Sequence, residues 1–225
     1  MLDERLSLAF SLYDPCALAA DIGTDHGYLP AALLQRGRCQ QMILTDISPS
    51  ALSHARQEMI RRRLTDRVSL RLGDGLQPLT EKCDVISVMG MGGRTISGLL
   101  RSGADRLQGA SLILSAHTDW PLIRQAVADL GYHIDREEPC LAANRFYLVI
   151  RARPGAEALT PRQVRLGVRL FDSASPLLPR FVQRRSEVLQ AHLDGLSEAA
   201  DPDPEEIATL REDLDTYRHF LEEHA

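Results

Sequence analysis

Ala17-Leu18-Ala19-Ala20-Asp21-Ile22-Gly23-Thr24-Asp25-His26-Gly27 is a short apolar run that leads into a turn with two glycines. The run is typical of a buried strand, and residues 28–35 after it are typical of a helix. Gly23 and Gly27 have no Cβ atom, so the turn can pass close to a ligand. Because ligands of open α/β sheets bind at the carboxyl ends of strands, we expect a ligand site here. A plain tight turn is the alternative.

The turn differs from the G-x-G-x-x-G fingerprint of dinucleotide-binding proteins, because Asp25 stands where that fingerprint has its middle glycine. A carboxylate is unfavourable beside a pyrophosphate but suits a cofactor that carries a sulfonium and an ammonium group. The sequence therefore weighs against a nicotinamide cofactor. A nicotinamide-dependent dehydrogenase stays a weak alternative.

Strands and helices alternate along the first two thirds of the chain, which indicates a parallel, doubly wound sheet. The last two predicted strands have no helix between them, so we expect an antiparallel edge. The fold class is therefore α/β, a Rossmann-like seven-stranded sheet of the class I methyltransferase kind. The predicted strands are residues 17–22, 42–46, 68–72, 85–89, 111–114, 132–137 and 146–151.

The strand signal ends near Arg153-Pro154-Gly155, and only helical patterns follow. We therefore predict a sheet domain over residues 1–153 and a helical arm over residues 154–225. Val182, Leu189 and Leu196 recur every seven residues, and apolar residues from Ile207 to Leu221 alternate in steps of three and four. This spacing favours an antiparallel, coiled-coil-like pair of helices.

Three further groups of residues follow predicted strands and would lie at the same edge of the sheet. Asp46, followed by Ile47, can accept hydrogen bonds from both hydroxyls of a ribose, although a strand-end cap is the alternative. Gly73-Asp74-Gly75 would bring an acid near an adenine amino group, unless it is only an Asp-Gly turn. Met89 and Gly90-Met91-Gly92-Gly93 follow the next strand, where close backbone approach would line a reaction centre.

The overall charge does not by itself indicate a nucleic-acid partner, because the formal net charge is −5 and the pI is about 5.8. Two clusters of arginines could bind phosphate, or could simply be solvated helix faces. The clusters are Arg61, Arg62 and Arg63 with Arg67, and Arg180, Arg184 and Arg185 with Arg162, Arg165 and Arg169 nearby.

Nothing in the sequence indicates a membrane, a secretion signal or a metal. The charged N-terminus lacks the apolar segment of a signal peptide, and no apolar run approaches a membrane span. Cys16, Cys39, Cys83 and Cys140 have no metal-ligand spacing, so we expect isolated thiols in a reduced compartment. We expect a cytoplasmic protein without a metal, as a monomer or weak dimer.

The chain resembles the bacterial tRNA (adenine-22)-N1-methyltransferases. The combination of Asp21-Ile-Gly-Thr-Asp-His26 with Gly90-Met-Gly-Gly93 is specific to this pattern. The other matching stretches are Arg5-Leu6, Asp46-Ile47, Arg71-Leu-Gly-Asp-Gly-Leu76, Asn144-Arg-Phe-Tyr-Leu-Val-Ile150, Arg165-Leu-Gly167 and Pro176-Leu177. The resemblance implies a class I fold, a coiled-coil-like arm, S-adenosylmethionine as cofactor with S-adenosylhomocysteine as product, and tRNA as substrate.

The motifs and the resemblance together predict a cofactor site made from four strand ends. The expected cofactor-binding residues are Asp21, Gly23, Asp25, His26, Gly27, Asp46, Ile47, Gly73, Asp74, Gly75, Met89 and Gly90. The sequence departs from the family at Ser115-Ala116-His117, where the family has Gln-Pro-Asn. That loop should face the target base, so another RNA position or a small-molecule acceptor stays open, as does a non-catalytic adaptor that binds the cofactor.

Methyl transfer from a sulfonium to adenine N1 needs alignment more than it needs a base, because the N1 lone pair is already available. The ring becomes cationic, so nearby carboxylate or carbonyl oxygens favour the transition state. The adenine must be unpaired or flipped out, since N1 lies on its Watson–Crick edge. The expected catalytic residues are Asp25, His26, Gly90, Met91 and His117, while structural roles for both histidines stay open. Tyr28 could stack on the base or belong to the core.

Overall fold

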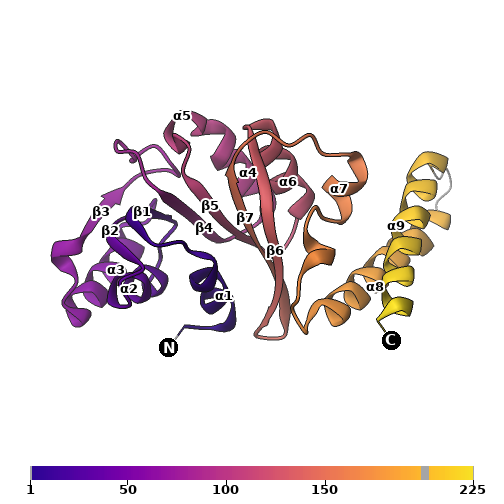
Figure 1. Cartoon of the computed structure of the whole chain (residues 1–225), viewed down its shortest axis with the longest axis horizontal. Coiled ribbons are helices and arrows are strands. Elements are labelled where there is room, and N and C mark those ends of the chain that lie inside the picture. The colour runs from indigo at the N-terminus through magenta and orange to yellow at the C-terminus, as the bar shows by residue number, and fades with distance from the viewer. Residues whose placement is uncertain (1, 199–202, 225) are drawn as a thin grey trace. The chain divides into compact units, whose positions relative to one another are not determined.

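The computed structural model describes residues 2–198 and 203–224, and its contacts divide the chain into two compact units. The first unit extends to Leu170 and contains the sheet with the helices around it (Figure 1). The second begins at Phe171 and is helical. The sequence placed the division earlier, at residues 153 and 154. The segment between the two positions lies with the sheet because of a buried ion pair described below.

Seven strands form one sheet in the order β3-β2-β1-β4-β5-β7-β6 (Figure 1). The first five in this order run parallel, and β7 is antiparallel to both β5 and β6. The predicted Rossmann-like methyltransferase sheet with an antiparallel edge is thereby confirmed. The strands are β1 (Cys16–Ile22), β2 (Cys39–Asp46), β3 (Val68–Leu72), β4 (Val85–Met91), β5 (Ser111–Ala116), β6 (Tyr132–Ala142) and β7 (Arg145–Pro154).

Strands β6 and β7 are longer than the sequence predicted, because a two-residue turn joins them directly. Both turn residues, Ala143 and Asn144, have positive φ angles, 47° and 59°. Such turns match the twist of a hairpin and let the ladder continue to its end. The two strands pair from Tyr132 with Pro154 to Ala142 with Arg145.

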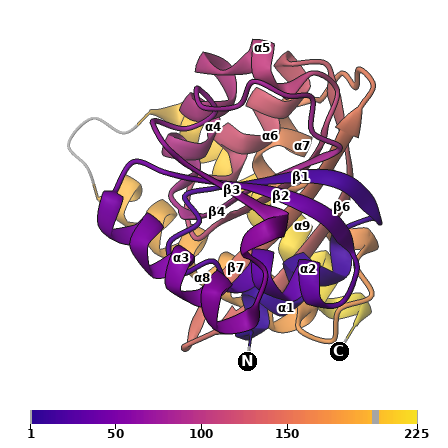
Figure 2. The same cartoon turned by 90° about the vertical axis from the view of Figure 1, so that its left-hand side faces the viewer.

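Helices cover both faces of the sheet, with α1, α2 and α3 on one face and α4, α5 and α6 on the other (Figure 2). Ser48 caps α3 by accepting a hydrogen bond from the Ala51 N–H, and Pro49 occupies the first turn. The α-helices of this unit are α1 (Glu4–Leu12), α2 (Tyr28–Gln35), α3 (Pro49–Arg62), α4 (Gly93–Ser102), α5 (Ala104–Leu107), α6 (Trp120–Asp129) and α7 (Pro161–Leu166). Two short 3-10 helices are η1 (Thr65–Arg67) and η2 (Leu170–Asp172), and η2 begins at the last residue of this unit.

Cys16 and Cys39 are neighbours, which corrects the expectation of four isolated thiols. They stand opposite each other where β1 and β2 begin, and their Sγ atoms lie 2.7 Å apart. Cys83 and Cys140 are buried elsewhere, and all four cysteines are free thiols. The sequence could not indicate this pair, because its proximity depends on the register of two parallel strands.

A buried ion pair attaches residues beyond β7 to the sheet unit. The Arg124 side chain on α6 is 2% exposed and donates from Nε to Glu137 Oε1 of β6 at 2.7 Å. Its Nη1 donates to the carbonyl oxygens of Val164 and Arg165. The other Glu137 oxygen accepts from the N–H groups of Val168 and Arg169. The segment 164–169 is therefore fixed to α6 and β6.

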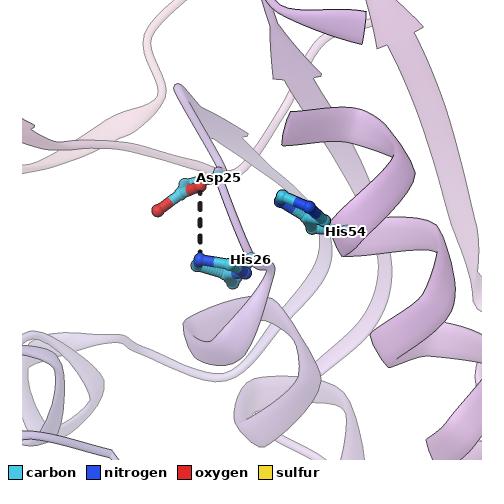
Figure 3. Close-up of side chains that lie close together, drawn as sticks. All are labelled: Asp25, His26 and His54. Carbon is cyan, nitrogen blue, oxygen red and sulfur yellow. Dashed lines mark ion pairs between the residues drawn. The ribbon is translucent and has the colours of Figure 1, made fainter. Parts of the chain in front are cut away.

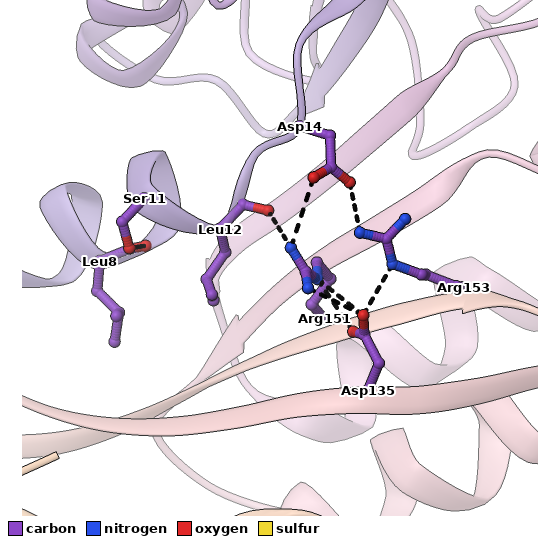
Figure 4. A network of polar contacts seen from close by, with 7 residues as sticks. All are labelled: Leu8, Ser11, Leu12, Asp14, Asp135, Arg151 and Arg153. Carbon is purple, nitrogen blue, oxygen red and sulfur yellow. Dashed lines mark hydrogen bonds and ion pairs between the residues drawn. The ribbon is translucent and has the colours of Figure 1, made fainter. Parts of the chain in front are cut away.

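A second polar network holds the end of α1 against the antiparallel edge (Figure 4). Asp135 on β6 accepts from Arg151 and Arg153 on β7, and Arg153 also donates to Asp14 at 2.6 Å. Arg151 donates in addition to the carbonyl oxygen of Leu12, the last residue of α1. The network fixes where α1 lies, and α1 contributes to the cavity described below.

The second unit is built on α8 (Leu178–Ser197) and α9 (Pro204–Glu223). Leu193, Leu210 and Leu214 form its small apolar core, with Leu189, Leu196 and Ile207 packed against them. Arg218 donates to Gln190, and His192 lies beside Glu206, as expected for antiparallel helices. Within residues 2–198 and 203–224, no helix has both the length and the apolarity that crossing a membrane requires.

Substituting alanine for Gly93 should destabilise the fold by about 2–3 kcal/mol, because overpacking against rigid backbone is costly. A Cβ on Gly93 would lie 2.6 Å from the Thr118 carbonyl oxygen and would also collide with the carbonyl oxygen of Asp119. Gly98, on the same helix, has open space at its Cβ position. Gly98→Ala should therefore stabilise by about 0.5–1 kcal/mol. Urea unfolding of both variants checks the prediction, and equal effects would contradict it.

Candidate active site

A cavity of about 580 Å³ opens at the carboxyl ends of β1, β2, β3 and β4, with α1 at one side. Most of the predicted site residues line it, from four separate segments of the chain. The predicted residues that line the cavity are Asp21, Gly23, Asp25, His26, Asp46, Ile47, Gly73, Asp74, Gly75, Met89, Gly90 and Met91.

Asp21 is a carboxylate buried at the base of this cavity. Tyr13 donates its hydroxyl hydrogen to Ser87 Oγ at 2.6 Å, and Ser87 in turn donates to Asp21 Oδ1. Burial raises the pKa of Asp21 to about 6, although the hydrogen bond from Ser87 opposes this rise. A cationic ligand group in the cavity would favour the charged form of this carboxylate.

Asp46 connects three of the turns that form the cavity. Its Oδ1 accepts from the N–H of Ser48 at 2.9 Å, and its Oδ2 accepts from the N–H of Asp25 at 3.3 Å. The Asp46 carbonyl oxygen accepts from the N–H of Gly73 at 3.1 Å. Each carboxylate oxygen has a further lone pair, so the side chain can be held in place and still bind ligand hydroxyls.

Gly23 shows why the turn after β1 requires glycine. Its φ angle is +70°, and a Cβ at this position would collide with the methyl group of Met91. The turn after β1 and the end of β4 are therefore in close contact inside the cavity. Gly27 has a different environment, because its Cβ position faces Ala55 and Met59 of α3 instead of the cavity.

The rings of Tyr28, His26 and His54 form a stack at the rim. His26 lies 5.3 Å from Tyr28 and 4.9 Å from His54, at interplanar angles of 13° and 15°. The Asp25 carboxylate lies 3.7 Å from His26 Nε2 (Figure 3). Asp25, His26 and His54 bring one oxygen and two nitrogen ligand atoms within 4.8 Å of one another. Two stacked imidazoles direct their lone pairs in nearly parallel planes, so this geometry favours an aromatic platform over an ion site.

His117 does not line the cavity. Its ring meets the edge of Tyr147 on β7 at 6.3 Å. The Arg5 guanidinium of α1 stacks on the same tyrosine, 5.3 Å from the ring centre, and Arg5 does line the cavity. Of the predicted catalytic residues, Asp25, His26, Gly90 and Met91 line the cavity, whereas His117 lies outside it.

Sequence reasoning missed several residues that the fold brings to the cavity. Thr95 and Leu99 come from α4, and Asp3 and Arg5 come from α1. His54 joins the ring stack from α3. Arg5 belongs to a stretch that resembles the family, but the sequence did not place it in the site. The position of each of these residues depends on where a helix packs against the sheet.

The arginine cluster at residues 61–67 has structural partners within the sheet unit. Arg61 and Arg62 both bind the buried carboxylate of Glu58, at 2.6 Å and 2.5 Å. Arg67 donates to the carbonyl oxygens of Leu34, Cys39 and Gln40. These three guanidinium groups stabilise the loops that join α2, β2 and α3, so only part of their charge is available to an RNA.

The family described as Methyltransferase domain matches residues 2–150, which include the whole cavity. The chain belongs to this family. Within the methyltransferase domain, residues 23–27 form the turn after β1, Asp46 ends β2, and Asp74 follows β3. The cavity at these strand ends is therefore the active-site region of a methyltransferase.

This chain is similar to two curated methyltransferases and to a crystal structure. The tRNA (adenine(22)-N(1))-methyltransferase of Bacillus subtilis is 31% identical over 156 residues, which cover 68% of this chain and 66% of the relative. The release factor glutamine methyltransferase of Cereibacter sphaeroides is 33% identical over 76 residues, which cover 34% of this chain and 27% of that protein. A candidate tRNA (m1A22) methyltransferase of Streptococcus pneumoniae, crystallised with S-adenosyl-L-methionine, superposes with a TM-score of 0.85 at 28% identity, covering 98% of this chain and 100% of its own.

Proposed function

We propose that this methyltransferase transfers a methyl group from S-adenosylmethionine to N1 of an adenine in tRNA, at position 22. The observation that carries the proposal is that the fold likeness extends beyond the cofactor-binding half. The superposition on the Streptococcus pneumoniae structure covers 98% of this chain, including the helical unit. Methyltransferases acting on different substrates share the sheet, so similarity outside the sheet supports the choice of substrate.

The residues of the cavity fit S-adenosylmethionine. Asp21 provides a buried carboxylate that an ammonium group can neutralise, and Asp46 ends β2 with lone pairs available for ribose hydroxyls. Asp74 lies in the loop after β3 and lines the same cavity. When bound, this cofactor supplies a methyl group activated by its positive sulfur.

The chain's own contribution to the reaction is alignment and electrostatics. Gly90 and Met91 line the cavity where β4 ends, and Gly23 lets the facing turn approach them closely. Adenine N1 needs no general base, so these residues exclude water and position the ring. The exposed Asp25 carboxylate at the rim can stabilise the positive charge that develops on the adenine.

The test is transfer of labelled methyl from S-adenosylmethionine to unmodified bacterial tRNA, followed by nucleoside analysis. We expect N1-methyladenosine, lost when adenine 22 is replaced by guanine. Asp46→Ala should weaken cofactor binding by about tenfold or more, since hydrogen bonds to a charged group are removed. Asp66→Ala, an exposed acid outside the cavity, is the matched control and should behave as wild type.

The other outcomes separate the remaining possibilities. A different methylated nucleoside would keep the methyltransferase but overturn the target, with His117 in place of the family asparagine as the first residue to exchange. Methylation of a small acceptor alone would overturn the RNA substrate. Cofactor binding without transfer to any acceptor would indicate an adaptor instead of an enzyme.

A further inference from the structure

Arg5 has a guanidinium group that the protein leaves largely without hydrogen-bond acceptors. It lies in the first turn of α1, and its side chain is 23% exposed. Its Nη2 donates a long hydrogen bond to Asp3 Oδ2 at 3.4 Å, and the Asp3 side chain is 43% exposed. Its Nε is buried and has no acceptor among the described residues. An arginine has five N–H donors, so most of them lack a protein partner here.

The surroundings of Arg5 hold the guanidinium in the cavity instead of releasing it to solvent. Its Cζ lies over the Tyr147 ring of β7, 5.3 Å from the ring centre, and the His117 ring makes a T-shaped contact with the same tyrosine. The Nη1 atom lies 3.7 Å from the Cβ position of Gly90, at the end of β4. The N–H groups of a guanidinium lie in its own plane. Two of them can therefore donate hydrogen bonds to two oxygens of one anion.

The charge of the reaction favours a phosphate over the adenine ring as the partner of Arg5. The carboxylate of the cofactor is the other anion that could enter this cavity, and the cofactor affinity of Arg5→Gln distinguishes it from a phosphate in the second experiment below. The adenine ring becomes positive as it accepts the methyl group, so a guanidinium beside the ring would oppose the transfer. A phosphate of the same nucleotide is negative throughout and needs planar, bidentate donors. A base that leaves its stack brings its own phosphate toward the site. The position beside Gly90 is therefore suited to the backbone of the reacting nucleotide.

We infer that Arg5, stacked on Tyr147, binds the phosphate group of the nucleotide that is methylated. The inference rests on the proposed function in that it takes the acceptor to be a nucleotide. It assigns His117 the role of a positioning residue, since His117 reaches the substrate only through Tyr147 and Arg5. On this inference, the loop Ser115-Ala116-His117, which departs from the family sequence, supports the phosphate site through the contact of His117 with Tyr147 and does not contact the base.

The first experiment needs no RNA. With S-adenosylhomocysteine bound, we expect the wild-type protein to bind adenosine 5′-monophosphate about tenfold more tightly than adenosine, because charge-assisted hydrogen bonds are gained. Arg5→Gln should abolish that preference, and Arg5→Lys should retain part of it. Arg36→Gln is the matched control, because Arg36 also stacks on an aromatic ring, that of Phe10, but lies outside the cavity. Equal affinity of the wild type for both compounds would overturn the inference.

The second experiment uses tRNA and separates the inference from the proposed function. Arg5→Gln should lower kcat/KM by about 10–30-fold with cofactor affinity unchanged, and should reduce the salt dependence of kcat/KM by about one phosphate contact. A merely structural role would change the melting temperature or cofactor affinity and leave the salt dependence intact. If the wild type methylates no RNA yet shows the Arg5-dependent phosphate preference, the proposed substrate fails and the phosphate site stands.

Discussion

Asp21→Asn should make the ligand-free protein more stable and its cofactor binding about 100-fold weaker. The two effects have one cause, the charge of a carboxylate buried beneath the cavity. At pH 8 we expect the free energy of unfolding to increase by about 3 kcal/mol, because a buried charge is removed while Ser87 can still donate to the new amide. Affinity falls because a charge-assisted hydrogen bond inside a protein contributes roughly 1.5–3 kcal/mol.

The pH dependence follows from the pKa of Asp21, which burial raises from its ordinary value of 3.8 to about 6. Between these values the folded protein binds more protons than the unfolded chain, so its stability falls as the pH rises through this window. The loss is complete above about pH 6 and corresponds to about 3 kcal/mol. Asp21→Asn lacks this contribution, so its stability advantage should disappear near pH 4. Affinity for a cofactor with an ammonium group should rise with pH through the same window in the wild type alone.

Calorimetric cofactor titration and urea unfolding between pH 4 and pH 8 measure both effects. The matched control is Asp84→Asn. Asp84 lies just before β4 and accepts hydrogen bonds from the N–H groups of Ala17 and Leu18, at the opposite end of β1 from Asp21. This variant should lose stability and keep its cofactor affinity. An Asp21→Asn protein that is less stable than wild type at pH 8 would show that the carboxylate stabilises the fold, against the prediction.

The sheet could be predicted from the sequence because each strand carries its own signal. Residues 17–22 and 42–46 are largely apolar runs, as strands covered on both faces must be. Asp21 is next to the end of the first run, and Asp46 ends the second. The carboxyl ends of parallel strands meet at one edge of the sheet, so the sequence predicted that Asp21, Asp46 and Asp74 lie close together. The cavity contains all three.

The remainder could not be predicted because it depends on packing between elements distant in sequence. Arg5 and Tyr147 are separated by 142 positions along the chain, and only the placement of α1 against β7 brings them together. His54 reaches the ring stack because α3 packs beside α2. The division at Leu170 has the same origin, since a lone Arg124 in a helix and a lone Glu137 in a strand show no sign of their pairing.

Arg124→Met should lower the free energy of unfolding by about 3–5 kcal/mol, because removing one partner leaves the other charge buried and unpaired. The Arg124 and Glu137 side chains are 2% and 0% exposed, so solvent cannot replace the lost contact. The substitution also leaves the carbonyl oxygens of Val164 and Arg165 without their donor. We expect residues 164–169 to detach first, seen as faster amide exchange at Val168 and Arg169, whose N–H groups bind Glu137.

A double-mutant cycle with Glu137→Gln separates the ion pair from the other hydrogen bonds. The glutamine keeps an acceptor for one backbone N–H and removes the charge, so the double variant should lose less stability than the sum of the two single variants. Arg101→Met is the matched control, since Arg101 binds Asp129 at 2.8 Å on the surface, with both side chains more than 40% exposed. It should cost less than about 1 kcal/mol. Strictly additive losses, or an Arg124→Met protein as stable as the control, would mean that α6 and β6 hold residues 164–169 by apolar packing alone.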